Sequence, residues 1–249
     1  MLKRALIIPD THLPYHDKRA YKLMIKVAKE LDPHEIVILG DYADFYSVSS
    51  HGKDPTILGL LIDEVESVNK HLDELDDLFP RAKKVYICGN HEHRLERYLC
   101  DKAPALFGIT SIEHLFKLNL RPNWKFVPYG PRQNHKVLGS YLNARHEPLS
   151  SSAKATAAKA LCSLVYGHIH RIEASHIVGL DDKNHVCFSV GWLGDKFLDK
   201  IYGYVKTHHQ WQLGFGEAFV DDETGYFYHE TIHILDNYTC VSGGKLFKG

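Results

Sequence analysis

Clusters of histidine, aspartate and asparagine recur at five separated points of this 249-residue chain. The clusters are DTH at 10–12, GDYAD at 40–44, GNHE at 89–92, ARHE at 144–147 and GHIH at 167–170. Carboxylate, imidazole and amide groups are ligands for divalent metals such as manganese, iron, zinc or nickel, and no cysteine belongs to the set. A structural zinc ion needs only four ligands in a closed tetrahedron. The candidates are too many for one ion, which favours two.

Each cluster alone is weak evidence, because a histidine near an aspartate is usually a surface residue or bonds to a backbone carbonyl. Their common position is the stronger signal, since each cluster follows an apolar segment that is typical of a strand. Ligand sites of open α/β sheets lie at the carboxyl ends of the strands. We therefore expect the five clusters to meet at one edge of the fold.

The segments between the clusters have the periodicity of the strands and helices that would position them. Short apolar runs at 4–9, 35–39 and 84–88 predict buried strands, each ending at a cluster. Helical spacing of apolar residues over 20–31 and 58–78 predicts two amphipathic helices between these strands. The alternation indicates a parallel sheet covered by helices, and so an α/β fold.

The rest of the chain adds further strands and one irregular region. Strands, several in an antiparallel or mixed sheet, are predicted by apolar, aromatic and β-branched runs at 137–145, 161–166, 185–190, 215–220 and 225–235. Proline and glycine between 98 and 135 predict an inserted cap or loop region around 98–135. No repeat, low-complexity tract or linker interrupts the pattern, so we expect one domain over residues 1–249.

Composition excludes several classes of protein. Apolar residues make up 44% and charged residues 24% of the chain, which is ordinary for a globular protein. Thirty basic and 31 acidic residues give no overall attraction to DNA or anionic membranes, although a local basic patch is compatible with this balance. The apolar run at the N-terminus is shorter than a signal peptide core or a membrane span. Five cysteines without close spacing predict reduced thiols, and we expect a cytoplasmic protein.

Taken together, the five motifs resemble those of the calcineurin-like metallophosphoesterase superfamily, in the family's order and across residues 10–170. The resemblance implies two packed mixed β-sheets flanked by helices, a four-layer α/β/β/α sandwich. It also implies an enzyme that hydrolyses phosphate esters with two divalent metal ions. We expect manganese, with iron, zinc or nickel as alternatives.

The family pattern implies a role for each cluster. Asp10, His12, Asp41 and His170 would surround one ion, and the carboxylate of Asp41 would bridge to the second. Two cations about 4 Å apart neutralise the phosphate oxygens and hold a bridging hydroxide in line with the phosphorus. A shared carboxylate keeps the ions close despite their mutual repulsion.

The second ion would be held by Asn90, His146 and His168. His146 is the departure from the pattern, because the family often has His-Gly where this chain has His146 followed by Glu147. His135 is the rival ligand, but it precedes the predicted strand instead of following it. We therefore favour His146.

The remaining assignments concern the substrate. His91 would act as the general acid for the leaving oxygen or as a clamp on the phosphoryl group. Asp44 would pair with His91 and raise its affinity for a proton, although Asp44 could instead cap a helix. Arg94 and Arg145 are candidates to bind a substrate phosphate, against the alternative of solvated surface positions.

Three functions are compatible with this reading. The first is a phosphatase acting on a nucleotide, a small phosphomonoester or a phosphoprotein. The second is a phosphodiesterase or DNA nuclease that uses the same metal pair, with nucleic acid as its substrate. The near-neutral charge favours a small phosphate ester and no membrane partner. The third, a non-catalytic binding scaffold, is remote because every proposed ligand and His91 are present.

Overall fold

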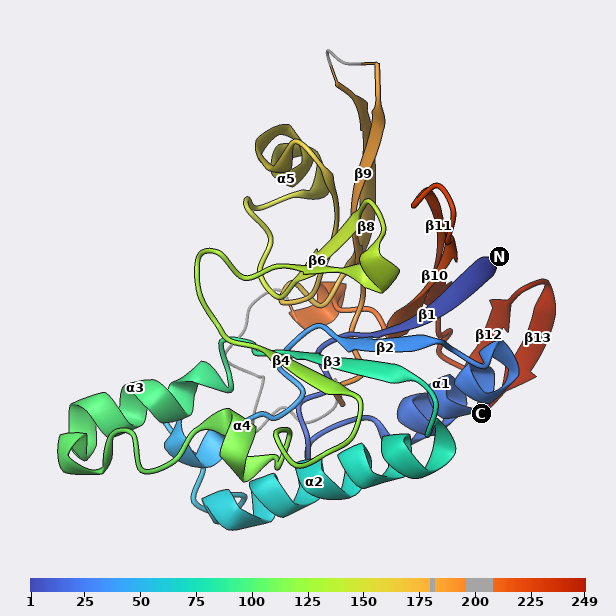
Figure 1. Cartoon of the computed structure of the whole chain (residues 1–249). Coiled ribbons are helices and arrows are strands. Elements are labelled where there is room, and N and C mark those ends of the chain that lie inside the picture. The colour runs from blue at the N-terminus through green and yellow to red at the C-terminus, as the bar shows by residue number, and fades with distance from the viewer. Residues whose placement is uncertain (180–181, 196–207) are drawn as a thin grey trace.

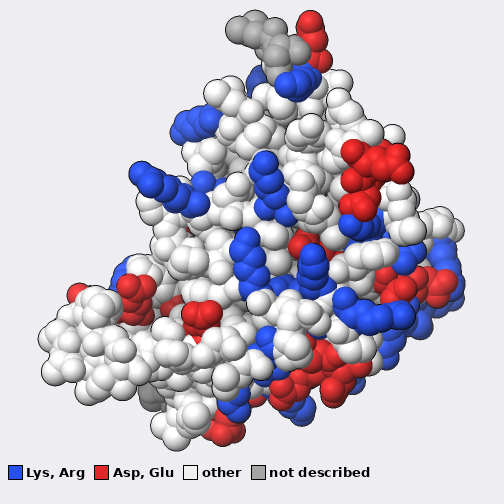
Figure 2. Space-filling model, in the orientation of Figure 1, with Lys and Arg blue, Asp and Glu red and all other residues white. Residues whose placement is uncertain are grey.

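The computed structural model describes residues 1–179, 182–195 and 208–249 of the chain. Two mixed β-sheets pack face to face, and helices cover both outer faces (Figure 1). The predicted four-layer α/β/β/α sandwich is confirmed. Basic and acidic side chains both reach the visible surface (Figure 2), in agreement with the near-zero net charge.

The first sheet has six strands in the order β11-β10-β1-β2-β3-β4. Its parallel part consists of β1 (Leu2–Ile8), β2 (Glu35–Ile38), β3 (Lys83–Ile87) and β4 (Trp124–Val127). Antiparallel pairing adds β10 (Gly214–Asp221) and β11 (Phe227–His233) beside β1. The connections between the parallel strands contain α1 (Lys18–Leu31) and α2 (Leu61–Leu78), which cover the outer face of this sheet.

The second sheet has five strands in the order β5-β6-β7-β9-β8. The strands are β5 (His135–Lys136), β6 (Leu142–Arg145), β7 (Ser163–Tyr166), β8 (Ile172–Val178) and β9 (Asn184–Val190). Its three central strands β6, β7 and β9 are parallel, and the two edge strands are antiparallel to their neighbours. Helix α5 (Ala153–Ala160) packs on the outer face. A hairpin of β12 (Thr239–Ser242) and β13 (Lys245–Lys248) lies beside α1 (Figure 1).

The apolar runs are continuous because both faces of the strands are covered. Leu6 and Ile8 of β1 pack against the helices, whereas Ala5 and Ile7 pack toward the second sheet. No helix in the described part of the chain is long and apolar enough to cross a lipid bilayer.

Several local elements differ from the sequence-based expectation. The region predicted as an insert holds α3 (His93–Lys102), a 3₁₀ turn (Pro104–Leu106), α4 (Ile112–Leu115) and the edge strand β4. Only the end of the predicted 137–145 strand is extended. Its start is a tight turn in which Leu138 has φ 50°. Helix α5 and the β12–β13 hairpin were not predicted.

The first sheet buries the carboxyl group of Glu217 with a single hydrogen bond among the described residues. Glu217 of β10 is 1% exposed, and its Oε1 accepts a 2.8 Å hydrogen bond from the Ser242 hydroxyl. Its Oε2 finds no hydrogen-bond donor among the described residues. Burial raises the pKa of Glu217 to about 6, the Ser242 hydrogen bond opposes the rise, and the neighbouring Glu230 adds to it. The folded protein therefore binds this proton more tightly than the unfolded chain does.

This preference predicts a pH-dependent effect of Glu217→Gln on stability. The folded state holds the proton more tightly than the unfolded chain, so the stabilisation is complete below the ordinary value of 4.5 and is lost as the pH rises through about 6. Relative to wild type, the free energy of unfolding of Glu217→Gln should increase by about 1 to 2 kcal/mol between pH 4.5 and about pH 8. Urea unfolding at both pH values measures this difference. The exposed Glu66→Gln control should show no change, and an equal response of both variants would contradict the prediction.

Candidate metal centre

Three buried side chains meet at the end of β1: Asp10 and His12 follow β1, and His170 lies in the loop after β7. The Nε2 atoms of His12 and His170 lie 3.2 Å apart, and Nε2 of His170 lies 3.0 Å from Oδ2 of Asp10. The Nδ1 atom of His12 donates a 2.8 Å hydrogen bond to the carboxylate of Asp44. Because Nδ1 of His12 is engaged, its Nε2 is directed into the cluster as a ligand atom. The three ligand atoms are close enough to hold one metal ion.

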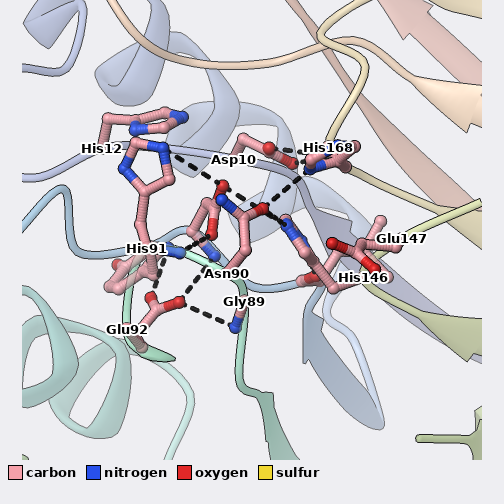
Figure 3. A network of polar contacts seen from close by, with 12 residues as sticks. Asp10, His12, Gly89, Asn90, His91, Glu92, His146, Glu147 and His168 are labelled. Carbon is pink, nitrogen blue, oxygen red and sulfur yellow. Dashed lines mark hydrogen bonds and ion pairs between the residues drawn. The ribbon is translucent and has the colours of Figure 1, made fainter. Parts of the chain in front are cut away.

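A second cluster lies beside the first and joins loops of both sheets. The amide oxygen of Asn90 lies 2.8 Å from Nε2 of His146 and 2.8 Å from Nδ1 of His168. The same Nε2 lies 3.3 Å from Oδ2 of Asp41. Figure 3 shows Asn90, His146 and His168 pointing toward one another from separate segments of the chain. Asp41, His146 and His168 also have ligand atoms close enough for one ion.

The chemistry of these atoms fits a cation. The Nδ1 atom of His146 lies 2.9 Å from the carbonyl oxygen of Leu39, which can only accept, so this nitrogen carries the proton. In the neutral ring, Nε2 then directs a lone pair at the oxygens of Asn90 and Asp41. Acceptors that face acceptors repel unless a proton or a metal ion lies between them. Mixed carboxylate, imidazole and amide donors suit divalent metals, and the two clusters suit two ions.

The pKa values of His146 and Asp41 show that positive charge is favoured in the second cluster. Burial disfavours a charged imidazole, but the Asp41 carboxylate raises the pKa of His146 to about 10. Burial also disfavours the ionised form of Asp41, yet the imidazoles of His146 and His91 hold its pKa well below its ordinary value. A divalent cation would compete with the protons on these groups.

Asp41 lies between the two clusters and organises both. Its backbone carbonyl accepts hydrogen bonds from the N–H groups of Thr11 and His12 at 3.0 and 2.9 Å. Its Oδ1 accepts a 2.8 Å hydrogen bond from the backbone N–H of His91. Its Oδ2 faces His146, so one carboxylate contacts the segments that follow β3 and β6.

The loops that carry these side chains turn sharply. His12, Asp41, His168 and His170 all have positive φ values, of 55°, 47°, 71° and 57°. This conformation costs each residue of order 1 kcal/mol and is concentrated at functional sites. The turn at His168 is held because its N–H donates to both carboxylate oxygens of Asp10, at 2.9 and 3.0 Å.

His91 lies at the edge of the first cluster, with Asp44 and Arg94 around it. Its Nδ1 donates to the backbone carbonyl of Asp44 at 2.9 Å, and the Asp44 carboxylate is 3.5 Å from the same nitrogen. Arg94 is 7% exposed, and its guanidinium donates to Nε2 of His91 and to the carbonyl of Asp44 at 2.8 and 2.9 Å. Burial, His12 and Arg94 lower the pKa of His91, against the effect of Asp41 and Asp44.

Comparison with known proteins agrees with this geometry. The family description of calcineurin-like phosphoesterases matches residues 3–235 of the chain. The chain belongs to this family. Calcineurin-like phosphoesterases are metal-dependent hydrolases of phosphate esters, so the chain is a metal-dependent phosphoesterase, and the predicted family is confirmed.

Two phage proteins are similar over nearly their whole length. The gene 54 proteins of Mycobacterium phages L5 and D29 are each 25% identical to this phosphoesterase over 267 aligned positions, which cover 98% of this chain and 96% of theirs. Among solved structures, vacuolar protein sorting 29 of Cryptosporidium parvum is similar with a TM-score of 0.47 and 10% identity, over 98% of this chain and 94% of that one. The YfcE phosphoesterase of E. coli has a TM-score of 0.40 and 13% identity, over 92% and 98%.

Glu92 supports the centre of this phosphoesterase, although the sequence analysis assigned it no role. Its fully buried carboxylate accepts five hydrogen bonds of 2.7 to 3.0 Å. The donors are the backbone N–H groups of Asp41, Tyr42, Ala43 and Gly89 and the hydroxyl of Tyr86. Glu92 thereby ties the loop after β2 to the loop after β3. Its place within GNHE, at a strand end, was the available signal.

Three residues weighed from the sequence lie outside the clusters. Arg145 immediately precedes His146, and its Nε has no hydrogen-bond acceptor in the described part of the chain. The side chain of His135 lies 3.3 Å from the carboxylate of Glu35, at the amino end of β2, and belongs to neither ligand cluster. Glu147 accepts a 2.7 Å hydrogen bond from the hydroxyl of Tyr129.

Gly89 is a position where the surrounding atoms leave no room for a side chain. A methyl group there would overlap the backbone nitrogen and Oδ1 of Asp41 and press on the Glu92 carboxylate. We expect Gly89→Ala to lower the free energy of unfolding by about 1 to 3 kcal/mol, the usual cost of overpacking, and to weaken metal binding because Asp41 must move.

Urea unfolding and calorimetric titration with Mn²⁺ measure the two effects. Gly52→Ala is the matched control, because no heavy atom lies within 4 Å of the added methyl group. The control should change stability by less than about 1 kcal/mol. Equal stability and equal Mn²⁺ affinity of the two variants would contradict the steric role of Gly89.

Proposed function

We propose that this phosphoesterase is a phosphatase that uses two divalent metal ions to hydrolyse a nucleotide, another small phosphomonoester or a phosphoprotein. The supporting observation is the pair of ligand clusters on either side of the buried carboxylate of Asp41. Asp10, His12 and His170 would hold one ion, with Asp41 shared. A single cluster would have supported only a mononuclear or structural site.

The second ion would be held by Asn90, His146 and His168, again with Asp41. When bound, the two cations would neutralise the phosphate oxygens and make hydroxide available at neutral pH. Manganese is the metal we propose, because nitrogen and oxygen ligands are mixed and thiolates are absent from both clusters. Iron, zinc and nickel are the alternatives.

The chain itself would supply the proton for the leaving oxygen. His91 is fixed through Nδ1 by the carbonyl of Asp44, so Nε2, which here accepts a hydrogen bond from Arg94, is the atom that would exchange a proton. The Asp44 carboxylate would favour the protonated ring, and general acids of this kind accelerate reactions about a hundredfold to ten-thousandfold. Arg94 would bind a phosphate oxygen from its position beside Nε2 of His91. Arg145 is the second proposed phosphate contact.

We also propose a cytoplasmic location. All five cysteines are free, and three of them, Cys88, Cys187 and Cys240, are buried. Free thiols persist in reducing compartments, whereas oxidising compartments favour disulfides. The expected partner is the phosphate-ester substrate itself.

Activity should depend on the metal and favour monoesters. The protein loaded with Mn²⁺ should hydrolyse an aryl phosphate, lose this activity in EDTA, and regain it when Mn²⁺ is restored. Parallel assays on an aryl diester and on DNA distinguish the two enzymatic hypotheses. Faster turnover of the diester or of DNA would favour the phosphodiesterase or nuclease, and turnover that persists in EDTA would contradict metal dependence.

Substitutions distinguish the proposed role of His91 as general acid from the roles of the metal ligands. His91→Ala should retain Mn²⁺ binding but lose about a hundredfold or more in kcat. Asp41→Ala should lose the metals, as measured by calorimetry, because both clusters share its carboxylate. His93→Ala is the matched control, since this neighbouring histidine belongs to neither cluster and pairs with Glu96. Unchanged kcat in His91→Ala would exclude its role as the acid.

A further inference from the structure

A cleft of about 990 Å³ lies at the end of the sandwich opposite the metal centre. It is bordered by the amino ends of β1, β2, β3 and β4 and by β5 of the second sheet. Each strand advances about 3.3 Å per residue, so the start of β3 is roughly 20 Å from the loop that carries Asn90. The cleft is therefore separate from the candidate metal centre.

Four of the residues that line the cleft are cations without a partner among the described residues. Arg81, Lys83, Lys125 and Lys136 are all exposed, and none forms an ion pair or side-chain hydrogen bond with a residue that the structure describes. Figure 2 shows several basic side chains across the middle of the visible face. A fifth cation in the lining, Lys3, pairs with Asp222.

The carboxylates in the cleft do not neutralise these four cations. Glu35 is buried and accepts a 2.6 Å hydrogen bond from the backbone N–H of Leu138, and it lies 3.3 Å from Nε2 of His135. Asp32 lies 3.5 Å from the guanidinium of Arg4, outside the cleft. Both acidic groups in the lining thus have other partners: Glu35 contacts residues of the cleft wall, and Asp32 contacts Arg4 outside the cleft.

General basicity of the protein does not explain the concentration of charge. The whole chain has a formal net charge of −1, so a local excess of unpaired cations means an excess of acidic groups elsewhere. Like charges brought together in a concave surface repel one another, and this repulsion opposes folding. A bound polyanion would remove it.

The positions of the cations indicate a linear ligand. Lys83 and Lys125 lie on the adjacent strands β3 and β4 and, by strand alternation, project toward the space between the sheets, as do Val85 and Val127. Strands lie about 4.8 Å apart, so the cleft spans roughly 14 Å from β1 to β4. This length exceeds a single phosphate group. No aromatic ring other than histidine lines the described cleft to stack on a base.

We propose that this cleft binds a linear chain of phosphate groups through the phosphates, without stacking on bases. A single-stranded nucleic acid backbone and inorganic polyphosphate share this chemistry. An acidic peptide fits less well, because Pro33 and Leu138 are the only large apolar side chains in the lining and form no pocket for peptide side chains. The proposal does not depend on the activity of the metal centre.

Fluorescence anisotropy of a labelled oligothymidylate tests this site on the full chain with Mn²⁺, with intact probe verified after each measurement. The Lys83→Gln/Lys125→Gln variant should bind roughly tenfold to thirtyfold more weakly at 0.1 M salt, and the slope of log K against log salt should fall by about 1.4. Lys22→Gln/Lys29→Gln is the matched control, because it removes the same charge from exposed positions on α1 and should bind like wild type. Thermal unfolding checks that each variant is folded.

Competition identifies the source of the phosphate. Displacement of the probe by inorganic polyphosphate would support recognition of phosphate alone, whereas failure of polyphosphate to compete, with the variant effect intact, would identify nucleic acid as the ligand. Equal displacement by poly-glutamate of matched charge would overturn the assignment to phosphate. Equal affinity of the cleft variant and its control would overturn the site itself.

Discussion

The structure depends on holding together atoms that repel one another. Carboxylate, amide and imidazole acceptors from Asp10, Asp41, Asn90 and His146 face a common space at the edge of two sheets. Burying polar groups without donors is costly, and burying like charges is more so. Positive charge between them resolves the conflict, whether it is supplied by protons or by metal ions. The packing of the sandwich must therefore stabilise an arrangement that its own polar atoms oppose.

Three kinds of contact support the arrangement. The Leu39 carbonyl accepts a hydrogen bond from Nδ1 of His146, and the Asp44 carboxylate accepts one from Nδ1 of His12. In each histidine, Nε2 therefore faces the ligand cluster. The Glu92 carboxylate collects backbone N–H groups that would otherwise be unpaired in the tight loops. Gly89 allows these loops to approach each other. The strands that precede these loops are rigid, and neighbouring parallel strands fix where each loop begins. The loops can therefore move little relative to one another.

Local patterns in the sequence predict the helix-covered parallel sheet and the candidate ligands at its strand ends, whereas the four-layer sandwich was implied by the family resemblance. Apolar runs that end in polar clusters, such as 84–88 before Asn90, are visible within a short window. The support of the site is not local. Glu92 bonds to backbone groups some fifty residues earlier, and nothing near Glu92 in the sequence indicates them. Helix α5 escaped prediction because its alanine-rich sequence has little apolar periodicity, and β4 because it is short and pairs with only one strand.

The candidate ligands come from loops of both sheets, so bound metal would affect the stability of the fold as well as the reaction. An ion that binds only the folded state stabilises it, by about 2.7 kcal/mol when free metal is a hundredfold above its dissociation constant. Here that stabilisation would fasten Asp10 and Asn90 of one sheet to His146, His168 and His170 of the other. In a cell short of metal, the sandwich would open more often between its layers. The abundance of the protein, through exposure of the open chain to proteases, would then follow the metal content of its surroundings.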